Sequence, residues 1–421
     1  MLLGALSVGA QEKPVTAADY KQKVLEYSRQ IKQSAEERIA MQHAIKAAKT
    51  AFFPALDFSG SYQDRINKYD LDFGPGMSVE MDHNTYSLGA TVSQPVYAGG
   101  QIYNNYKAAQ IQGQIASEAE DLTTDNIVYA ADLNYWSAAA RKGMYDVMCQ
   151  YVDIVQELAN VLTTRFNDGQ ISKTDLLQVQ SRLKEAELNK SAAYKDYQIA
   201  LQNLNVLMGV PPMTPVEIAD AITMVQPLPM HIGEEAALQN RPDFTISKLN
   251  IEYQKRQINL SKAKYNPTLA IGFQGTWGTP MLNVKGSDQL WTPAVFASLK
   301  IPLFRWGARF KEVNSQKAIL RSKEYAMDYT RDQISQEVAN SWTSLTENTK
   351  QINVAEEACK IAEENLDLNT FSYNEGKLPI LDVLSAQLSW IQSYSSLIQT
   401  WYQQKASLAQ YNKAVGIRRL Q

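Results

Sequence analysis

Residues 95–100 read Pro-Val-Tyr-Ala-Gly-Gly, and residues 302–307 read Pro-Leu-Phe-Arg-Trp-Gly. The second stretch follows the first at an offset of 207 positions (95 to 302), and the same offset carries Asn167-Asp168-Gly169 onto Asn374-Glu375-Gly376. One constant register over so long a span indicates that the chain is internally duplicated.

Alternating apolar residues precede both stretches. In the first copy Leu56, Phe58 and Tyr62 alternate with polar residues, and in the second copy Leu269 and Phe273 do the same. Such alternation is typical of β-strands with one apolar face. Each copy contains two such runs of about ten residues, which is the length of a tilted strand that crosses a bilayer.

Long helical segments follow the strands. No proline occurs between Gly100 and Pro211 or between Gly307 and Pro379, and apolar residues recur at spacings of three and four. A helix over residues 101–166 would be roughly 100 Å long at about 1.5 Å per residue. A long coiled bundle accommodates such a helix, whereas a compact domain does not.

The sequence therefore predicts a mainly α fold built on a duplicated helix–strand–strand–helix–helix unit. Each repeat begins with a helical segment, at 17–53 and 233–265, and a polar loop separates its two strands. The expected segments are a first repeat over 14–208, with strands at about 55–64 and 85–96, a long helix at about 101–166 and a returning helix at 173–208; a proline-rich linker or equatorial region at 209–232; and a second repeat over 233–416, with strands at about 268–277 and 292–303, a long helix at about 307–373 and a returning helix at 380–415.

The bulk composition excludes several classes of protein. The chain carries 41 basic and 44 acidic residues and a formal net charge of −3, which does not fit a nucleic-acid partner. The three histidines and two cysteines share no metal-ligand or catalytic spacing. We therefore expect no enzyme activity, no metal and no cofactor. Residues 1–13 have the apolar, small-residue character of a signal-peptide remnant.

Four strands in one chain leave two open sheet edges. Lipid cannot hydrogen-bond the unpaired N–H and C=O groups of such edges, and bacterial outer-membrane barrels close with eight or more strands. Several copies of the chain must therefore share one barrel, and cyclic association provides this closure.

The repeated motifs resemble those of TolC-like outer-membrane efflux proteins, also called outer membrane factors. The resemblance covers about residues 15–416. The matching segments are the strand-to-helix junctions at 95–100 and 302–307, the helical hairpins at 165–180 and 373–387, and Arg241-Pro242-Asp243 at the start of the second repeat.

This resemblance implies a homotrimer in the outer membrane of a Gram-negative bacterium. Each protomer contributes four strands to a twelve-stranded transmembrane β-barrel and helices to a coiled-coil α-barrel tunnel in the periplasm. The implied function is that of the outer-membrane channel of a tripartite export system, which passes drugs, small molecules or secreted polypeptides outward. An inner-membrane pump supplies the energy, and a periplasmic adaptor protein links the two.

The resemblance also assigns roles to individual residues. By position, the residues that match a gate or constriction at the tunnel entrance are Thr174, Asp175, Tyr373 and Asp382. The residues that match adaptor-contacting tips are Asp168, Gly169, Glu375 and Gly376. The residues that match the strand-to-helix junctions are Pro95, Gly100, Pro302 and Gly307.

Simpler interpretations of these positions stay open. Asp175 and Asp382 also suit the first turn of a helix, where the helix dipole favours an acid. The Asp-Gly and Glu-Gly pairs also suit plain turns. Trp277 and Trp291 flank strand ends, where either an interfacial aromatic girdle or ordinary loop packing explains them.

Two other functions are alternatives at this stage. One is an outer-membrane channel dedicated to type I protein secretion. The other is a periplasmic coiled-coil scaffold without a channel, which explains the helices but not the alternating segments at matching points of both copies.

Overall fold

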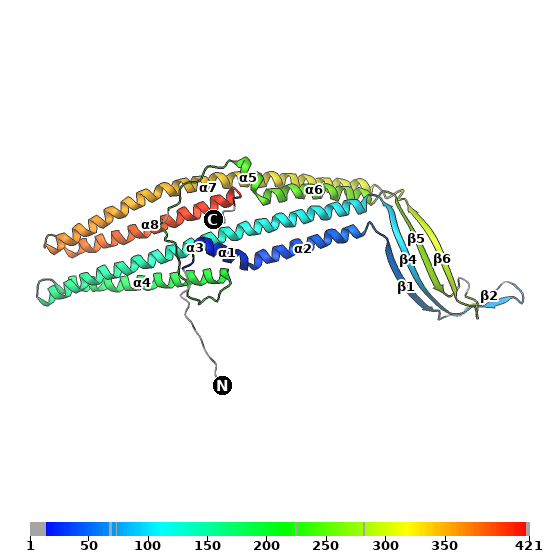
Figure 1. Cartoon of the computed structure of the whole chain (residues 1–421), viewed down its shortest axis with the longest axis horizontal. Coiled ribbons are helices and arrows are strands. Elements are labelled where there is room, and N and C mark those ends of the chain that lie inside the picture. Colours follow the sequence, from blue (N-terminus) through cyan, green and yellow to red (C-terminus); the bar gives the residue numbers. More distant parts are fainter. Residues whose placement is uncertain (1–13, 67–69, 73, 224, 281–282, 418–421) are drawn as a thin grey trace, which may run out of the picture. The chain divides into compact units, whose positions relative to one another are not determined.

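The computed structural model describes residues 14–66, 70–72, 74–223, 225–280 and 283–417 (Figure 1). The expected signal-peptide remnant at 1–13 lies outside these residues. The elements in chain order are α1 (Ala17–Tyr27), α2 (Arg29–Thr50), β1 (Ala55–Asp64), β2 (Asp70–Asp72), β3 (Ser78–Glu80), β4 (Asn84–Ala98), α3 (Gln101–Asn167), α4 (Lys173–Met208), α5 (Glu234–Asn240), α6 (Pro242–Ala263), β5 (Thr268–Gly278), β6 (Leu290–Lys300), α7 (Ala308–Asn374) and α8 (Ile380–Ala414).

The duplicated element order is present in both halves of the chain. The long helices α3 and α7 have 67 residues each, and the returning helices α4 and α8 have 36 and 35. The predicted mainly α fold with four long strands is therefore confirmed.

The first helical segment of each repeat is divided, which differs from the single helices we expected. Ser28 leaves helical geometry at φ −44° and ψ 116°, so that α2 restarts at Arg29. In the second repeat the break falls at Arg241, because the following Pro242 has no N–H to continue the helix and instead suits the first position of α6.

Two strand boundaries also differ from the expected ones. The strand expected at 292–303 lies at Leu290–Lys300, ending before Pro302, which cannot donate a ladder hydrogen bond. The strand expected at 85–96 extends to Ala98, because a bulge between Pro95 and Tyr97 absorbs the proline. Inside the polar loop of the first repeat, β2 and β3 form a short antiparallel hairpin.

The four long strands form one antiparallel sheet in the order β1-β4-β5-β6 (Figure 1). Its register brings the apolar residues of all four strands onto one face: Leu56 pairs with Val92, Val92 with Phe273, and Phe273 with Val295. The alternate face carries polar residues such as Asp57 and its partner Thr91. The sheet therefore has one continuous apolar face.

Aromatic residues form a row across one end of this face. Tyr62 pairs with Tyr86, and Trp277 pairs with Trp291. The rings of Tyr86 and Trp277 lie 5.8 Å apart and join the two pairs. A row of this kind at the edge of an apolar band is typical of an interfacial girdle, which favours that interpretation of Trp277 and Trp291 over loop packing.

The chain divides into two compact units, and each contains parts of both repeats. One comprises the chain up to Ala35, Glu118–Thr245 and the chain from Tyr329 onward; the other comprises Glu36–Ser117 and Ile246–Asp328. The repeats defined by the sequence are therefore not the units that pack as bodies. The second unit contains the sheet, and the first contains both helical hairpins.

The helical unit has a hydrophobic core made by α3, α4, α7 and α8 together. Val155, Leu162, Val179 and Val383 are among its fully buried aliphatic side chains. No helix among the described residues is both long and apolar enough to span a bilayer.

The proline-rich segment between the repeats is packed against this unit. Ile218 and Ile222 are buried, and the amide of Asn205 donates hydrogen bonds to the carbonyl oxygens of Pro212 (2.9 Å) and Thr214 (2.8 Å). The segment is therefore an integral layer around the helices.

Gly99 and Gly307 allow a matched test of the strand-to-helix turns. Both have left-handed φ angles, 62° and 73°, which cost an L-residue roughly 1–2 kcal/mol. A Cβ at Gly99 would also lie 2.7 Å from the carbonyl oxygen of Ala263, whereas a Cβ at Gly307 would meet no described atom within 4 Å. We expect Gly99→Ala to lower the thermal stability of the purified protein clearly more than Gly307→Ala. Equal losses would contradict this packing.

Candidate functional site

The two hairpin tips have the same backbone geometry. In the first, the N–H of Gln170 donates to the carbonyl of Arg165 (2.8 Å) and that of Gly169 to Phe166 (2.9 Å). In the second, Lys377 and Gly376 make the equivalent bonds at 2.9 and 3.0 Å. This is the Schellman pattern, which closes a helix around a left-handed glycine, and both glycines have φ near 73°.

The expected adaptor-contact residues form the ends of these tips. Asp168, Gly169, Glu375 and Gly376 are all exposed. No described atom lies within 4 Å of the position that a Cβ would take on either glycine. The tips therefore present backbone and two carboxylates to a partner without hindrance from their own chain.

The helices that leave the two tips begin differently. In the first hairpin Ser172 and Asp175 form a capping box: the N–H of Asp175 donates to Ser172 Oγ (3.2 Å), and the N–H of Ser172 donates to Asp175 Oδ2 (3.3 Å). In the second hairpin the corresponding cap is Pro379, whose side chain has no acceptor. Asp382 therefore lies in the first turn without a capping role and is exposed, as is Thr174.

Tyr373 joins the two tips, but through a residue that sequence reasoning missed. The guanidinium of Arg165 lies 5.1 Å from the centre of the Tyr373 ring, and Arg165 Nη2 donates to Asn374 Oδ1 (3.3 Å). Arg165 belongs to the first hairpin and Tyr373 to the second. Sequence offset gave no signal, since the counterpart of Arg165 in the second repeat is Ser372.

The four expected gate residues are thus only partly brought together in one chain. Tyr373 is 7 % exposed, and its hydroxyl has no hydrogen-bond partner among the described residues. The Asp175 carboxylate accepts from Ser172. Tyr373 and Asp175 therefore do not bond to each other in the described chain, and the Tyr373 hydroxyl is buried within it.

The strand-to-helix junctions turn the chain with positive-φ glycines. Gly100 and Gly307 have φ angles of 87° and 73°. Pro95 lies at the bulge of β4, and Pro302 follows the end of β6. The carbonyl of Gly99 accepts from Asn266 Nδ2 (2.9 Å), which fixes the first junction to the segment that precedes β5.

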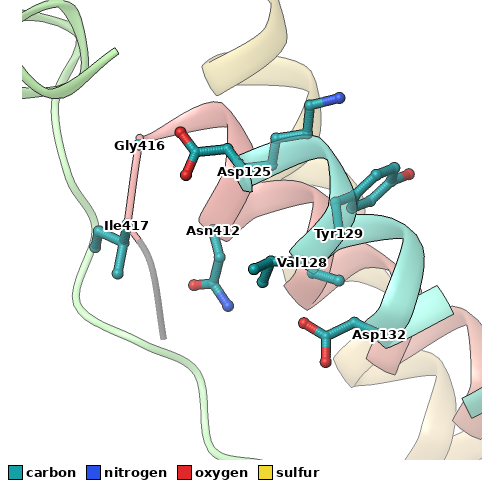
Figure 2. Close-up of a pocket in the computed structure, with 9 residues that line it drawn as sticks. Asp125, Val128, Tyr129, Asp132, Asn412, Gly416 and Ile417 are labelled. Carbon is teal, nitrogen blue, oxygen red and sulfur yellow. The ribbon is translucent and has the colours of Figure 1, made fainter. Parts of the chain in front are cut away.

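Two neighbouring hollows lie between α3 and α8 in the helical unit. Figure 2 shows one of them, which is lined by Asp125, Tyr129 and Asp132 from α3 and by Asn412 from α8. The other has a volume of about 230 Å³ and is lined by Lys21, Asp132, Trp136, Asp220 and Lys405, among others. Among the described residues no group of three or more His, Cys, Asp or Glu side chains could hold a metal ion.

A buried lysine dominates the electrostatics of the larger hollow. Lys405 is 2 % exposed, and its ammonium lies 4.2 Å from the centre of the Trp136 ring. Burial lowers the pKa of Lys405 to about 8, and Asp220 partly opposes that shift. Nearby, Lys21 pairs with Asp132 at 3.1 Å, and burial raises the pKa of Asp132 in spite of this pair.

Two helices carry a second apolar stripe that the chain itself leaves exposed. On α7 it comprises Val354, Ile361 and Leu368, which are 69, 62 and 59 % exposed. On α4 it comprises Leu188, Ala192, Ile199 and Val206. Both stripes follow heptad-type spacing, and each faces away from the buried residues of its own helix.

The sequence profile of the family described as outer membrane efflux protein matches residues 21–210 and 235–417, one segment in each repeat. The chain is 20% identical to the outer membrane efflux protein BepC of Brucella suis biovar 1 (strain 1330), over 84% of this chain and 75% of BepC. It is 19% identical to outer membrane protein TolC of Escherichia coli (strain K12), over 92% of this chain and 79% of TolC. The solved structure of the CmeC outer membrane channel of Campylobacter jejuni shares the fold, with a TM-score of 0.81 and 15% identity over 95% of this chain and 85% of that one.

The pKa of Lys405 predicts a defined pH dependence. Its ordinary value is 10.5 and its value in the folded protein is about 8. Below pH 8 both the folded and unfolded states hold the proton, and the folded state bears the whole cost of burying the charge, about 3 kcal/mol. Between pH 8 and 10.5 only the unfolded state keeps the proton, so this group makes the folded protein more stable as pH rises.

Lys405→Met keeps an unbranched side chain beside Trp136 and removes the titration. We expect the melting temperature of this variant to be no lower than that of the natural protein at pH 7. The difference between them should shrink as the pH rises from 8 to 10. Lys413→Met is the matched control. Lys413 is on the same helix as Lys405, and its ammonium also lies over an aromatic ring, that of Tyr129 on α3, at 4.9 Å. A constant difference across this range would show that Lys405 is not desolvated.

Proposed function

Because this chain belongs to the outer membrane efflux protein family, we propose that it acts as a passive conduit whose entrance is narrowed by its two hairpin tips. The protein is the outer-membrane channel of a tripartite export system, with its helical tunnel in the periplasm. It is a homotrimer that works with a periplasmic adaptor protein and an inner-membrane pump. Three copies of the β1-β4-β5-β6 sheet make the twelve-stranded barrel.

We also propose that the protein does not catalyse a reaction on the compound that it exports. The family and the fold are those of outer-membrane channels. Several buried ionisable groups of the helical unit pair with one another or with aromatic rings, as Lys21 does with Asp132 and Lys405 with Trp136. We therefore assign these groups a structural role. An exported compound would therefore pass through unaltered.

The observation that carries the proposed entrance is the link from Arg165 to Tyr373 and Asn374. It ties the first hairpin to the second at the point where the helices end. A cation–π contact contributes about 0.5–1 kcal/mol and a hydrogen bond of a charged donor roughly 1.5–3 kcal/mol. Threefold symmetry repeats the link in every protomer. We assign Thr174 and Asp175 in the first turn of α4, and Asp382 in the first turn of α8, to the same constriction.

We further propose that the exposed stripes of α4 and α7 are the faces through which protomers meet. In the sheet, β1 and β6 are the edges and each has one partner strand within the described chain. In the helical unit, α4 and α7 each bury one stripe inside the chain and leave the other exposed. A ring closes when the α7 stripe of one protomer packs on the α4 stripe of the next, as in a coiled coil.

We expect Arg165→Ala to raise the single-channel conductance of the trimer in planar bilayers, because it removes about 2 kcal/mol of tip-to-tip attraction per protomer. Lys377→Ala is the control, since Lys377 is equally near the tip and exposed. Tyr373→Phe keeps the ring and tests the hydroxyl separately: a rise in conductance would indicate that the hydroxyl helps to hold the entrance narrow. If Arg165→Ala leaves conductance unchanged, the tips do not set the width of the entrance.

Asp382→Ala should weaken cation preference and block by multivalent cations, since a ring of three carboxylates favours cations at a constriction. Reversal potentials in asymmetric salt measure this preference. Asp168→Ala provides a control with an exposed acid at the tip. Unchanged selectivity would show that Asp382 does not line the constriction and would leave it as an acid in the first turn of α8.

Ile361→Glu tests the protomer contact. Burying an isoleucine side chain contributes about 1.5–3 kcal/mol, and a carboxylate at the same place is costly to desolvate. We expect the trimer of this variant to dissociate at a markedly lower temperature in detergent. Lys360→Glu places the same charge one position away on the exposed surface and should have little effect. Equal behaviour of the two variants would exclude this face from the interface.

A further inference from the structure

The second strand-to-helix junction has acquired residues that the first lacks. At the offset of 207, the second repeat has Leu303-Phe304-Arg305-Trp306-Gly307-Ala308-Arg309-Phe310-Lys311 where the first has residues 96–104. We call residues 303–311 the junction segment. Four of its differences introduce a positive charge or a large ring: arginine for Ala98, tryptophan for Gly99, arginine for Ile102 and lysine for Asn104. One large aromatic ring and three positive charges have thus been added at one place.

Trp306 occupies a backbone conformation that suits glycine. Its φ is 46°, and it is the one non-glycine among the described residues with a positive φ. Its counterpart Gly99 has φ 62° in crowded surroundings that exclude a side chain. The second junction is open, so a side chain fits, but the left-handed conformation still costs free energy that glycine would avoid. A tryptophan in such a position indicates that its side chain has a use outside its own chain.

The apolar side chains of the junction segment are left uncovered by the protomer. Leu303, Phe304 and Trp306 are 91, 72 and 86 % exposed. The rings of Phe304 and Trp306 lie 5.0 Å apart at 63° and form one aromatic surface. An exposed patch of this kind on a folded chain marks a surface that something else covers.

The junction segment continues the apolar face of the sheet. Val295, Leu299, Ile301 and Leu303 alternate along β6 and beyond it and are all exposed. At the other end of β6 stands Trp291 in the aromatic row described above. From Trp291 to Leu303 the chain spans roughly 40 Å at about 3.3 Å per residue, or about 30 Å across a membrane at a tilt near 45°. The two aromatic ends therefore match the two surfaces of a bilayer.

The charge of the junction segment favours lipid over protein as the partner that covers it. Arg305, Arg309 and Lys311 are exposed. In the closed barrel that we propose, β1 of the neighbouring protomer pairs with β6. The end of α2, which precedes β1 in the chain, carries Lys46 and Lys49. These like charges disfavour a protein contact at this place, whereas an anionic headgroup complements both sets.

Glu312, the acid that directly follows the junction segment, is already engaged. Glu312 accepts from the hydroxyl of Tyr265 (2.9 Å) and from Lys264 (3.4 Å). The guanidinium of Arg305 lies 5.8 Å from the ring of that same Tyr265. The basic residues of the segment therefore keep their surplus of positive charge.

We propose that the junction segment is a membrane anchor that binds anionic phospholipid at the periplasmic surface of the outer membrane. Leu303, Phe304 and Trp306 enter the boundary between headgroups and acyl chains. Arg305, Arg309 and Lys311 contact the phosphates. This inference rests on the placement of the sheet in the outer membrane and is independent of the proposed entrance, which conductance measurements test separately.

The experiment uses the full-length trimer. Each basic residue of the junction segment is replaced by the residue at the matching position of the first repeat. Native mass spectrometry counts the phosphatidylglycerol molecules that stay bound after purification in the presence of that lipid. We expect the triple variant Arg305→Ala, Arg309→Ile, Lys311→Asn to retain fewer of them than the natural protein. The control is Lys317→Asn with Lys323→Asn, two exposed lysines further along α7, which should retain the full number. Equal retention by the triple variant and the natural protein would overturn the proposal.

Trp306→Gly tests the aromatic part. The difference in fluorescence between the natural protein and this variant is the emission of Trp306. In vesicles of phosphatidylethanolamine and phosphatidylglycerol with brominated acyl chains, we expect this emission to be strongly quenched. Bromines near the headgroup should quench it more than bromines near the chain end. In lipid-free detergent the variant should be as stable as the natural trimer, because glycine suits the left-handed backbone. A variant trimer that dissociates more readily in detergent would show that a neighbouring protomer covers Trp306, and the proposal would be wrong.

Discussion

The unpaired edges of β1 and β6 are the constraint on which the rest of this structure depends. A four-stranded sheet with one continuous apolar face can lie in a membrane only if every backbone N–H and C=O within the hydrocarbon finds a partner. The single chain leaves β1 and β6 without partners on one side. Closure by three copies removes both edges at once, and the helices that continue from the strands are then arranged as a ring as well. The exposed stripes of α4 and α7 are what such a ring requires, since a helix at the border between protomers must bury two faces.

The two repeats share the same order of helices and strands. We interpret the positions at which their residues differ as places where one repeat has a role that the other lacks. The Schellman turns at Gly169 and Gly376 are nearly identical, because any tip of this kind needs a left-handed glycine. In contrast, Ser172 is replaced by Pro379, which leaves Asp382 free of the capping role that Asp175 performs. Arg165 has Ser372 as its counterpart, and Trp306 has Gly99. Each of these differences lies at an end of the helical or the stranded part, where we propose the entrance and the lipid contact.

The helical unit also contains buried charge that contributes little to stability. Lys405 and Asp132 are both desolvated, and burial shifts the pKa of each toward its neutral form. Buried ionic groups of this kind are often retained for specificity rather than stability. Here Asp132 joins α3 to α1 through Lys21, and Lys405 joins α8 to α3 through Trp136. Asp220, in the segment between the repeats, accepts from the hydroxyl of Tyr135 (2.8 Å) and from the N–H of Ala17 (2.7 Å). The segment between the repeats is thereby fixed to the bundle.

The sequence by itself determined the features that depend on local chemistry and on the repeat. The offset of 207, the alternation in the strands and the Asp-Gly and Glu-Gly turns were enough to predict the duplicated element order and the mainly α fold, and the resemblance of the repeated motifs to known proteins indicated the family. They were enough because turn residues and periodicity act within a few positions of the chain. Only the tertiary structure decided the contact of Arg165 with Tyr373, the burial of Lys405 on Trp136, and the units that combine parts of both repeats. These contacts join residues more than two hundred positions apart, and no local propensity encodes which side chains meet when four helices pack.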